Sequence, residues 1–193
     1  MSATAAPYGA RPIGTLSANG SFTGKVRHIK IASGYATTIY TGDFVKLNTS
    51  GTGVLEKDTG TATMTPVGIF MGCAYTDPTS KQLTFNQRWP TGTVAADAVG
   101  YVIDDPAVIF QMQANGTIAQ TALGENAQVV QTAGSDSIGQ SKNAVNATTA
   151  TTATLPLRII DFVSGPDSVV GDSFTDVICK FNAGHQYSNT TGV

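Results

Sequence analysis

The alternation of apolar and polar positions is clearest in residues 66–89, and the other strands are interpreted around this stretch. Residues 66–75 are apolar almost throughout, an Asp-Pro turn follows, and Leu83 and Phe85 then alternate with polar side chains. This order is typical of a buried strand, a turn and a half-buried strand. We therefore predict a central hairpin, against which the other strands pack.

The remaining pattern consists of short apolar runs separated by turn residues. Turn signals recur every ~8–12 residues, which is typical of a sandwich or barrel. Residues 118–130 fit either a helix or a turn that enters a strand, and residues 147–154 fit either a solvated loop or an extended strand. The pattern as a whole predicts an all-β chain, arranged as an antiparallel β-sandwich or β-barrel of a β-tulip-like kind.

The two ends of the chain lack this pattern. Residues 1–21 are small and punctuated by Gly and Pro, which predicts an extended N-terminal arm rather than a core element. Residues 182–193 are polar and predict a C-terminal tail, which leaves residues 22–181 as the β-domain. Two alternatives stay open for that domain: one sheet system, or two lobes divided near residue 100.

Charge is scarce along the chain. The net charge of -2 argues against a nucleic-acid partner, which would require basic patches to neutralise phosphates. Charged residues make up 12% of the sequence, against about 25% in a typical soluble domain. Desolvating charge is costly, so a surface that ends against other subunits is better made of neutral polar groups. The composition favours an extensive interface, and the alternative is a neutral, Thr-rich β-surface without a partner.

The sequence also bears on the compartment. Cys73 and Cys179 lie far apart inside apolar runs, which favours buried free thiols in a reducing compartment over a disulfide. The N-terminal residues lack a basic region followed by an apolar core, so no signal peptide is expected. No apolar run approaches the length of about 18 residues that a membrane span requires.

The candidates for catalysis are weak. Asp104 and Asp105 are adjacent, so their side chains point to opposite sides of a strand, and with Pro106 they fit a turn better than a carboxylate pair. His28 and His185 are isolated and are expected to be ordinary surface residues. Phosphate-binding, nucleophile-elbow and dinucleotide-binding motifs are missing from the sequence. We therefore expect a protein that is not an enzyme and that needs no cofactor.

Two charged clusters also have simpler interpretations. The spacing of Asp167, Asp172 and Asp176 does not match a calcium loop, which favours a loop turn over a calcium site. Lys25 and Arg27 could pair with acids of a neighbouring subunit, although a solvated face is the simpler interpretation.

Several strand motifs together resemble a known class of proteins. They are residues 40–47 (YTGDFVKL), 66–72 (PVGIFMG), 102–111 (VIDDPAVIFQ) and 155–163 (LPLRIIDFV). In this order they look like virion structural proteins of tailed, marine podovirus-like bacteriophages, and most of all like head decoration, or cement, proteins. The resemblance runs from about residue 25 to the C-terminus.

The resemblance implies a β-rich protein on the outer surface of an icosahedral head, commonly a homotrimer, that bridges major capsid subunits and stabilises the shell. It implies no active site. The alternative is a receptor- or glycan-binding tail or fibre protein, in which exposed Tyr or Trp side chains would stack on sugars. Trp89 could do so, but its place beside Pro90 at the end of a strand favours a core or interface residue. Under the first reading, the residues expected at the capsid or subunit interface are Tyr8, Arg11, Lys25, Arg27, Trp89 and Tyr187.

Overall fold

The regular structure of the chain is almost entirely β, as the sequence predicts. The computed structural model describes residues 4–16 and 24–188. Within them lies a single short 3-10 helix, η1 (Gln120–Ala122). The strands are β1 (Arg11–Thr15), β2 (Arg27–Lys30), β3 (Ile39–Tyr40), β4 (Phe44–Leu47), β5 (Leu55–Lys57), β6 (Gly68–Thr76), β7 (Leu83–Asn86), β8 (Arg88–Trp89), β9 (Val99–Ile103), β10 (Val108–Gln113), β11 (Asn126–Ala127), β12 (Val129–Val130), β13 (Ala144–Val145), β14 (Leu157–Phe162) and β15 (Asp176–Phe181).

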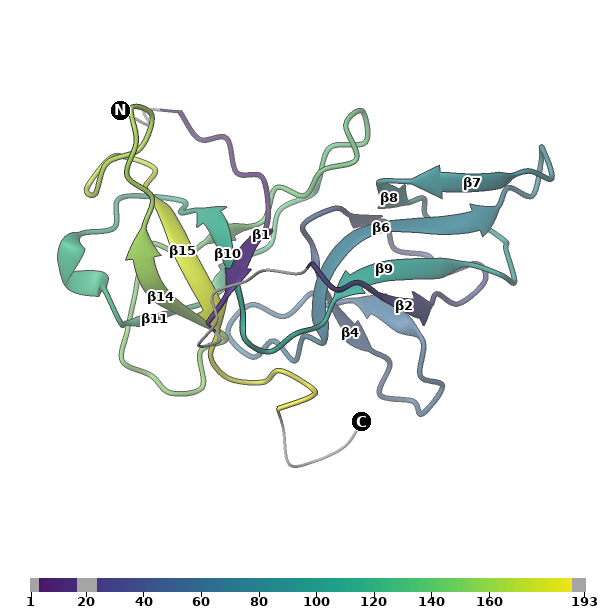
Figure 1. Cartoon of the computed structure of the whole chain (residues 1–193), viewed down its shortest axis with the longest axis horizontal. Helices are drawn as coiled ribbons and strands as arrows, with labels where there is room; N and C mark the ends of the chain where they lie inside the picture. The colour runs from purple at the N-terminus through teal and green to yellow at the C-terminus, as the bar shows by residue number, and fades with distance from the viewer. Residues whose placement is uncertain (1–3, 17–23, 189–193) are drawn as a thin grey trace.

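Most of the strands form two large antiparallel sheets that lie side by side along the long axis (Figure 1), while β3 pairs with β8 and β12 with β13 in two small sheets. The first sheet has the order β1-β10-β15-β14-β11. The second has the order β2-β9-β6-β4-β5, and β7 pairs with the free end of β6. The chain passes from the second sheet to the first between β9 and β10, at residues 104–107. Each sheet therefore belongs to its own lobe, and we name the first and second lobes after their sheets. Although β1 is N-terminal, it belongs to the first lobe, which is otherwise formed by the C-terminal half of the chain.

Each lobe has its own apolar cluster. The second lobe buries Trp89 and Phe70 completely, together with apolar residues of β2, β3, β4, β5 and β9. The first lobe buries Phe110 and Phe181 among residues of β10, β14 and β15. Phe44 of β4 reaches into that first cluster, with its ring centroid 5.6 Å from that of Phe110. Fully burying one large apolar side chain contributes about 1.5–3 kcal/mol, so Phe44 stabilises the contact between the lobes.

The turn between β3 and β4 makes several polar contacts between the lobes. The N–H of Ala10 donates to the carbonyl oxygen of Gly42 at 2.9 Å, and the N–H of Thr41 donates to that of Gly139 at 3.1 Å. The N–H of Ser141 in turn donates to the carbonyl oxygen of Thr41 at 2.9 Å. The N-terminal segment and the loop before β13 are thereby attached to the second lobe.

The predicted N-terminal arm is wrong for residues 11–15. These residues form β1, which pairs with β10 from Arg11 opposite Gln111 to Thr15 opposite Val108. Ladder hydrogen bonds come from the backbone, so a segment without apolar alternation can still join a sheet. At the edge Pro12 is tolerated, and the register shifts between Pro12 and Gly14. Residues 1–3 and 17–21 of the predicted arm lie outside the described residues.

The predicted C-terminal tail is likewise wrong for its first part. His185 is 3% exposed and not a surface residue, because residues after β15 fold back over the junction of the lobes. The side-chain amide of Gln186 accepts a hydrogen bond from the N–H of Leu47 at 2.7 Å and donates to its carbonyl oxygen at 3.2 Å. The backbone N–H of Gln186 donates to the carbonyl oxygen of Pro66 at 2.9 Å. Residues 189–193 lie outside the described residues.

The two cysteines are buried and free, as the sequence predicts, and each lies in a different lobe's cluster. Burial raises the pKa of the Cys73 thiol to about 12 and also raises that of Cys179. Among the described residues, no helix is long and apolar enough to cross a membrane.

Candidate functional site

The residues that the sequence offered for chemistry are occupied in structural contacts. Asp104 is ion-paired with Arg27, and the Asp105 carboxylate accepts a hydrogen bond from the N–H of Ala107 at 2.8 Å. His28 is exposed, with its ring centroid 4.7 Å from that of Tyr101. Over residues 4–16 and 24–188, no group of His, Cys, Asp or Glu side chains could hold a metal ion.

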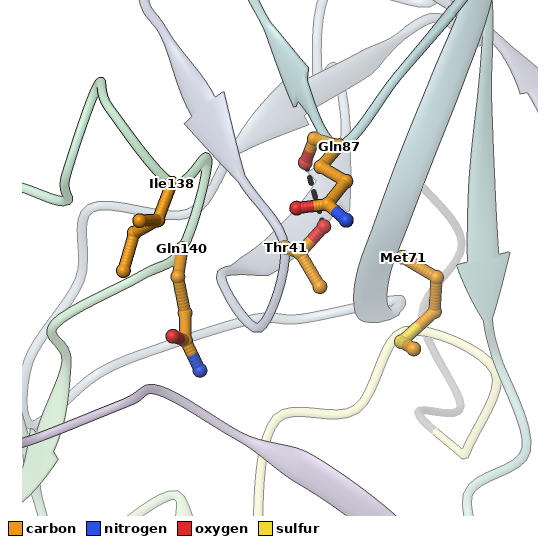
Figure 2. A pocket seen from close by; sticks show the side chains of 5 residues that line it. All are labelled: Thr41, Met71, Gln87, Ile138 and Gln140. Carbon is orange, nitrogen blue, oxygen red and sulfur yellow. Dashed lines mark hydrogen bonds between the residues drawn. The ribbon is translucent and has the colours of Figure 1, made fainter.

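Three neighbouring hollows form a groove at the junction of the lobes, which we call the junction groove. Its central hollow, about 290 Å³, is lined by Thr41, Met71, Gln87, Ile138 and Gln140 (Figure 2). Thr41, Met71 and Gln140 also line a neighbouring hollow of about 200 Å³, beside Tyr8, Arg11 and Pro12. Gln87 and Ile138 also line a third hollow of about 290 Å³, which extends to Phe85 and Arg88. Because neighbouring hollows share lining residues, the three together form the junction groove.

A β-bulge places Met71 in the groove. The pairing of β6 with β9 shifts register between Phe70 and Gly72, so Met71 is the extra residue. The strand β6 is strongly curved (Figure 1). Gly72 has a φ of 138°, a backbone conformation that a side chain disfavours. The glycine after Met71 is therefore the local sequence feature that turns this side chain toward the junction.

The groove is lined by neutral polar groups and apolar side chains in similar measure. The Thr41 hydroxyl donates to the backbone carbonyl oxygen of Gln87 at 2.6 Å, and Figure 2 shows this contact between Ile138 and Gln140 on one side and Met71 on the other. The Gln140 side chain donates to the carbonyl oxygen of Tyr8 at 3.4 Å. Such a surface offers hydrogen bonds and apolar contacts without strong charge.

Charged groups occur only toward the ends of the groove. At one end the Tyr8 hydroxyl donates to Asp176 at 3.0 Å, and burial is the largest cause that raises the pKa of both groups. The Arg11 guanidinium lies 4.7 Å from the centroid of the Tyr8 ring. At the other end Arg88 is ion-paired with Asp136. Each cation thus has a neighbour within the chain, which leaves the lining between them neutral.

An exposed apolar patch lies beside the groove, and the sequence did not predict it. We call it the β7 patch: Leu83 is 62% exposed, Phe85 is 70% exposed and Ile138 is 58% exposed. In the ladder Thr84 and Asn86 lie opposite Tyr75 and Cys73, which belong to the second core. Because neighbouring residues of a strand point to opposite faces, Leu83 and Phe85 point away from that core. The predicted hairpin is present, but the expected half-buried face of its second strand is open.

The backbone edge of β7 is open as well. The N–H of Asp77 donates to the carbonyl oxygen of Gln82 at 2.9 Å, which fixes the phase of the hairpin ladder. Along an antiparallel ladder, hydrogen-bonded residue pairs alternate with non-hydrogen-bonded pairs. The backbone groups of Thr84 and Asn86 therefore bond to β6, and those of Leu83 and Phe85 point outward. Among the described strands, β7 pairs only with β6. Its four residues also lack charge, proline and bulge, the usual protections of an edge.

The residues predicted for an interface do not form one surface. Tyr8 and Arg11 line the groove together. Arg27 and Tyr187 lie on a different surface, where the guanidinium is 5.6 Å from the Tyr187 ring centroid. Lys25 is exposed. Trp89 is 0% exposed, and its indole N–H donates to the carbonyl oxygen of Tyr35 at 3.1 Å, so it is a core residue.

No protein-family model matches the chain, and no curated protein or solved structure is significantly similar to it. The site must therefore be judged from its own chemistry. A neutral groove that continues into an exposed apolar strand edge can hold another polypeptide, through backbone hydrogen bonds along the edge and apolar contacts beside it.

Proposed function

We propose that this chain is a structural assembly protein, and specifically a capsid decoration protein on the outer surface of an icosahedral phage head. There it would bridge neighbouring major capsid subunits and stabilise the shell. The observation that carries the proposal is the β7 patch, which exposes large apolar side chains beside an unprotected strand edge.

Two further features support the proposal. Charged residues make up only 12% of the sequence, which suits a surface that is desolvated when subunits meet. The strand motifs at residues 40–47, 66–72, 102–111 and 155–163 are similar to those of head decoration proteins of tailed phages. That similarity also implies a homotrimer, whose symmetry would multiply weak contacts with the shell.

The burial of Trp89 removes one support for the alternative of a glycan-binding tail or fibre protein. A glycan-binding site requires an aromatic face that a sugar can reach, and Trp89 was one residue that could have provided it, although its place beside Pro90 favours the core or an interface. Because Trp89 is fully buried between Tyr75 and the carbonyl of Tyr35, it cannot stack on a sugar in this conformation. We therefore favour the head over the tail as the place of assembly.

The experiment is co-sedimentation of the purified protein with expanded phage heads that lack it, with unexpanded shells as the control. The proposal predicts saturable binding to expanded heads, in a stoichiometry of many copies per head, and little binding to unexpanded shells. A well-folded protein that binds neither particle would contradict the head assignment and would favour the tail or fibre reading.

A further inference from the structure

A buried cluster joins the two lobes at a place that the proposed function does not use. Its members are Asp43 after the β3–β4 turn, Lys57 at the end of β5, and Asn143 before β13. Asp43 and Asn143 are 0% exposed, and the Lys57 side chain is 11% exposed. A primary amine, a carboxamide and a carboxylate are thus held together away from bulk water.

Asp43 lies between the other two side chains. One of its carboxylate oxygens, Oδ2, is 2.8 Å from the Lys57 ammonium nitrogen. The other oxygen, Oδ1, accepts a hydrogen bond from the Asn143 amide nitrogen at 3.2 Å and another from the Ser141 hydroxyl at 2.6 Å. One carboxylate can therefore exchange protons with both the amine and the amide, as a general acid–base does.

The carbonyl oxygen of the Asn143 side chain has a donor of its own. The backbone N–H of Thr132 points at Asn143 Oδ1 from 3.1 Å. Because a carboxylate needs a donor and an N–H needs an acceptor, these two contacts fix which end of the amide is which. A backbone N–H aimed at a carbonyl oxygen stabilises the negative charge that develops there when a nucleophile attacks the carbon.

We propose that Lys57 and Asn143 form an intramolecular isopeptide bond, with Asp43 as the acid–base. Lys57 first transfers a proton to Asp43, and its neutral Nζ then attacks Cγ of Asn143. The Nζ–Cγ bond forms, and the Thr132 N–H binds the tetrahedral oxyanion. Asp43 delivers a proton to Nδ2, the Cγ–Nδ2 bond breaks, and ammonia leaves with the remaining proton as ammonium. The exchange of one amine for another needs neither oxidant nor reductant.

The bond would connect the lobes covalently. Lys57 belongs to the second sheet, and Asn143 precedes β13 in the half of the chain that forms the first lobe. The bond does not rest on the proposed function, since it is measured on the purified chain without any phage head. Failure of one proposal therefore leaves the other intact.

The test is the mass of the purified, folded protein and of its tryptic peptides. The intact wild-type chain should be lighter than its sequence by one ammonia. Trypsin should yield a branched peptide that joins residues 47–81 to residues 143–158, because an acylated Lys57 is no longer cleaved. Wild-type protein at its full sequence mass, with linear peptides 47–57 and 143–158, would overturn the proposal.

Two variants identify the atoms involved. Lys57→Arg keeps a cation beside Asp43 but has no amine to acylate, so it should show the full sequence mass. Asp43→Asn keeps both reacting groups and removes the acid–base, so it too should retain its ammonia, with circular dichroism to check folding. Loss of ammonia that persists in Lys57→Arg would place the reaction elsewhere, and a crosslink in Asp43→Asn would refute the role of Asp43.

Discussion

Gly68 lies where β6 approaches the end of β9 most closely, and this contact makes glycine necessary. A Cβ atom at residue 68 would lie 2.2 Å from the carbonyl oxygen of Ile103 and 2.9 Å from the Cα of Asp104. Because both are backbone atoms, they cannot move aside as a flexible side chain would. We expect Gly68→Ala to reduce the free energy of unfolding by about 1–3 kcal/mol, the usual cost of overpacking, as measured by urea denaturation.

A matched control for this substitution exists in the loop before β15. A Cβ at Gly165 would meet nothing within 4 Å, so Gly165→Ala should change the free energy of unfolding by no more than about 0.5 kcal/mol. Equal stabilities of the two variants would contradict the packing described for β6 and β9.

At the scale of single residues, the sequence predicts which side chains are apolar but not always which way they point. The alternation of Leu83 and Phe85 defines two faces of β7, and the period is the same whichever face meets the core. His185 was predicted at the surface because its neighbours in sequence are polar. Its ring instead packs against Phe181, and the neighbouring Gln186 holds the segment against Leu47 of β4, which is distant in sequence.

The segment after β15 should make the stability of the protein depend on pH. Burial lowers the pKa of His185 to about 4, although the carboxylates of Asp104 and Asp105 oppose this shift. The folded state thus binds this proton less readily than the unfolded state, for which the reference pKa is 6.5. Stability from this group is complete above that value and falls as the pH drops toward about 4.

The size of this effect follows from linkage. Between about pH 7 and pH 4.5 the shift corresponds to a loss of roughly 2–3 kcal/mol. In His185→Phe the ring cannot titrate, so urea denaturation at the two pH values should show a smaller loss than in the wild type. The two losses are compared because other groups titrate in both proteins. An equal loss in both would show that His185 is not buried in its neutral form.

At the scale of elements, strands that are themselves apolar were predictable and strands that depend on a partner were not. The stretches that became β6, β10, β14 and β15 carry their own pattern of buried residues. β1 has no such pattern, because it joins the sheet through backbone pairing with β10. The junction groove combines segments near residues 8–12, 41–42, 71, 85–88 and 136–140, and of its lining only Tyr8 and Arg11 were selected from the sequence.

At the scale of the whole molecule, the lobes differ in what they offer a partner. The first lobe carries scattered exposed apolar residues, such as Leu123 and Val169. The second ends in the β6–β7 hairpin, which projects from the body at one end of the long axis (Figure 1). Single exposed apolar residues are normal on a protein surface, whereas several beside an open strand edge indicate an interaction site. We therefore expect a partner to bind at the hairpin end.

Head binding by two double variants tests whether the β7 patch contacts the capsid. Leu83→Lys/Phe85→Lys places charge on the β7 patch, and Leu123→Lys/Val169→Lys adds the same charge to exposed positions of the other lobe. Both should unfold within about 1 kcal/mol of the wild type, because all four side chains are largely exposed. We expect the first variant to lose at least about tenfold in affinity for expanded heads, or 1.4 kcal/mol, while the second binds like the wild type. Equal binding by the two variants would show that the β7 patch is not the surface that contacts the head.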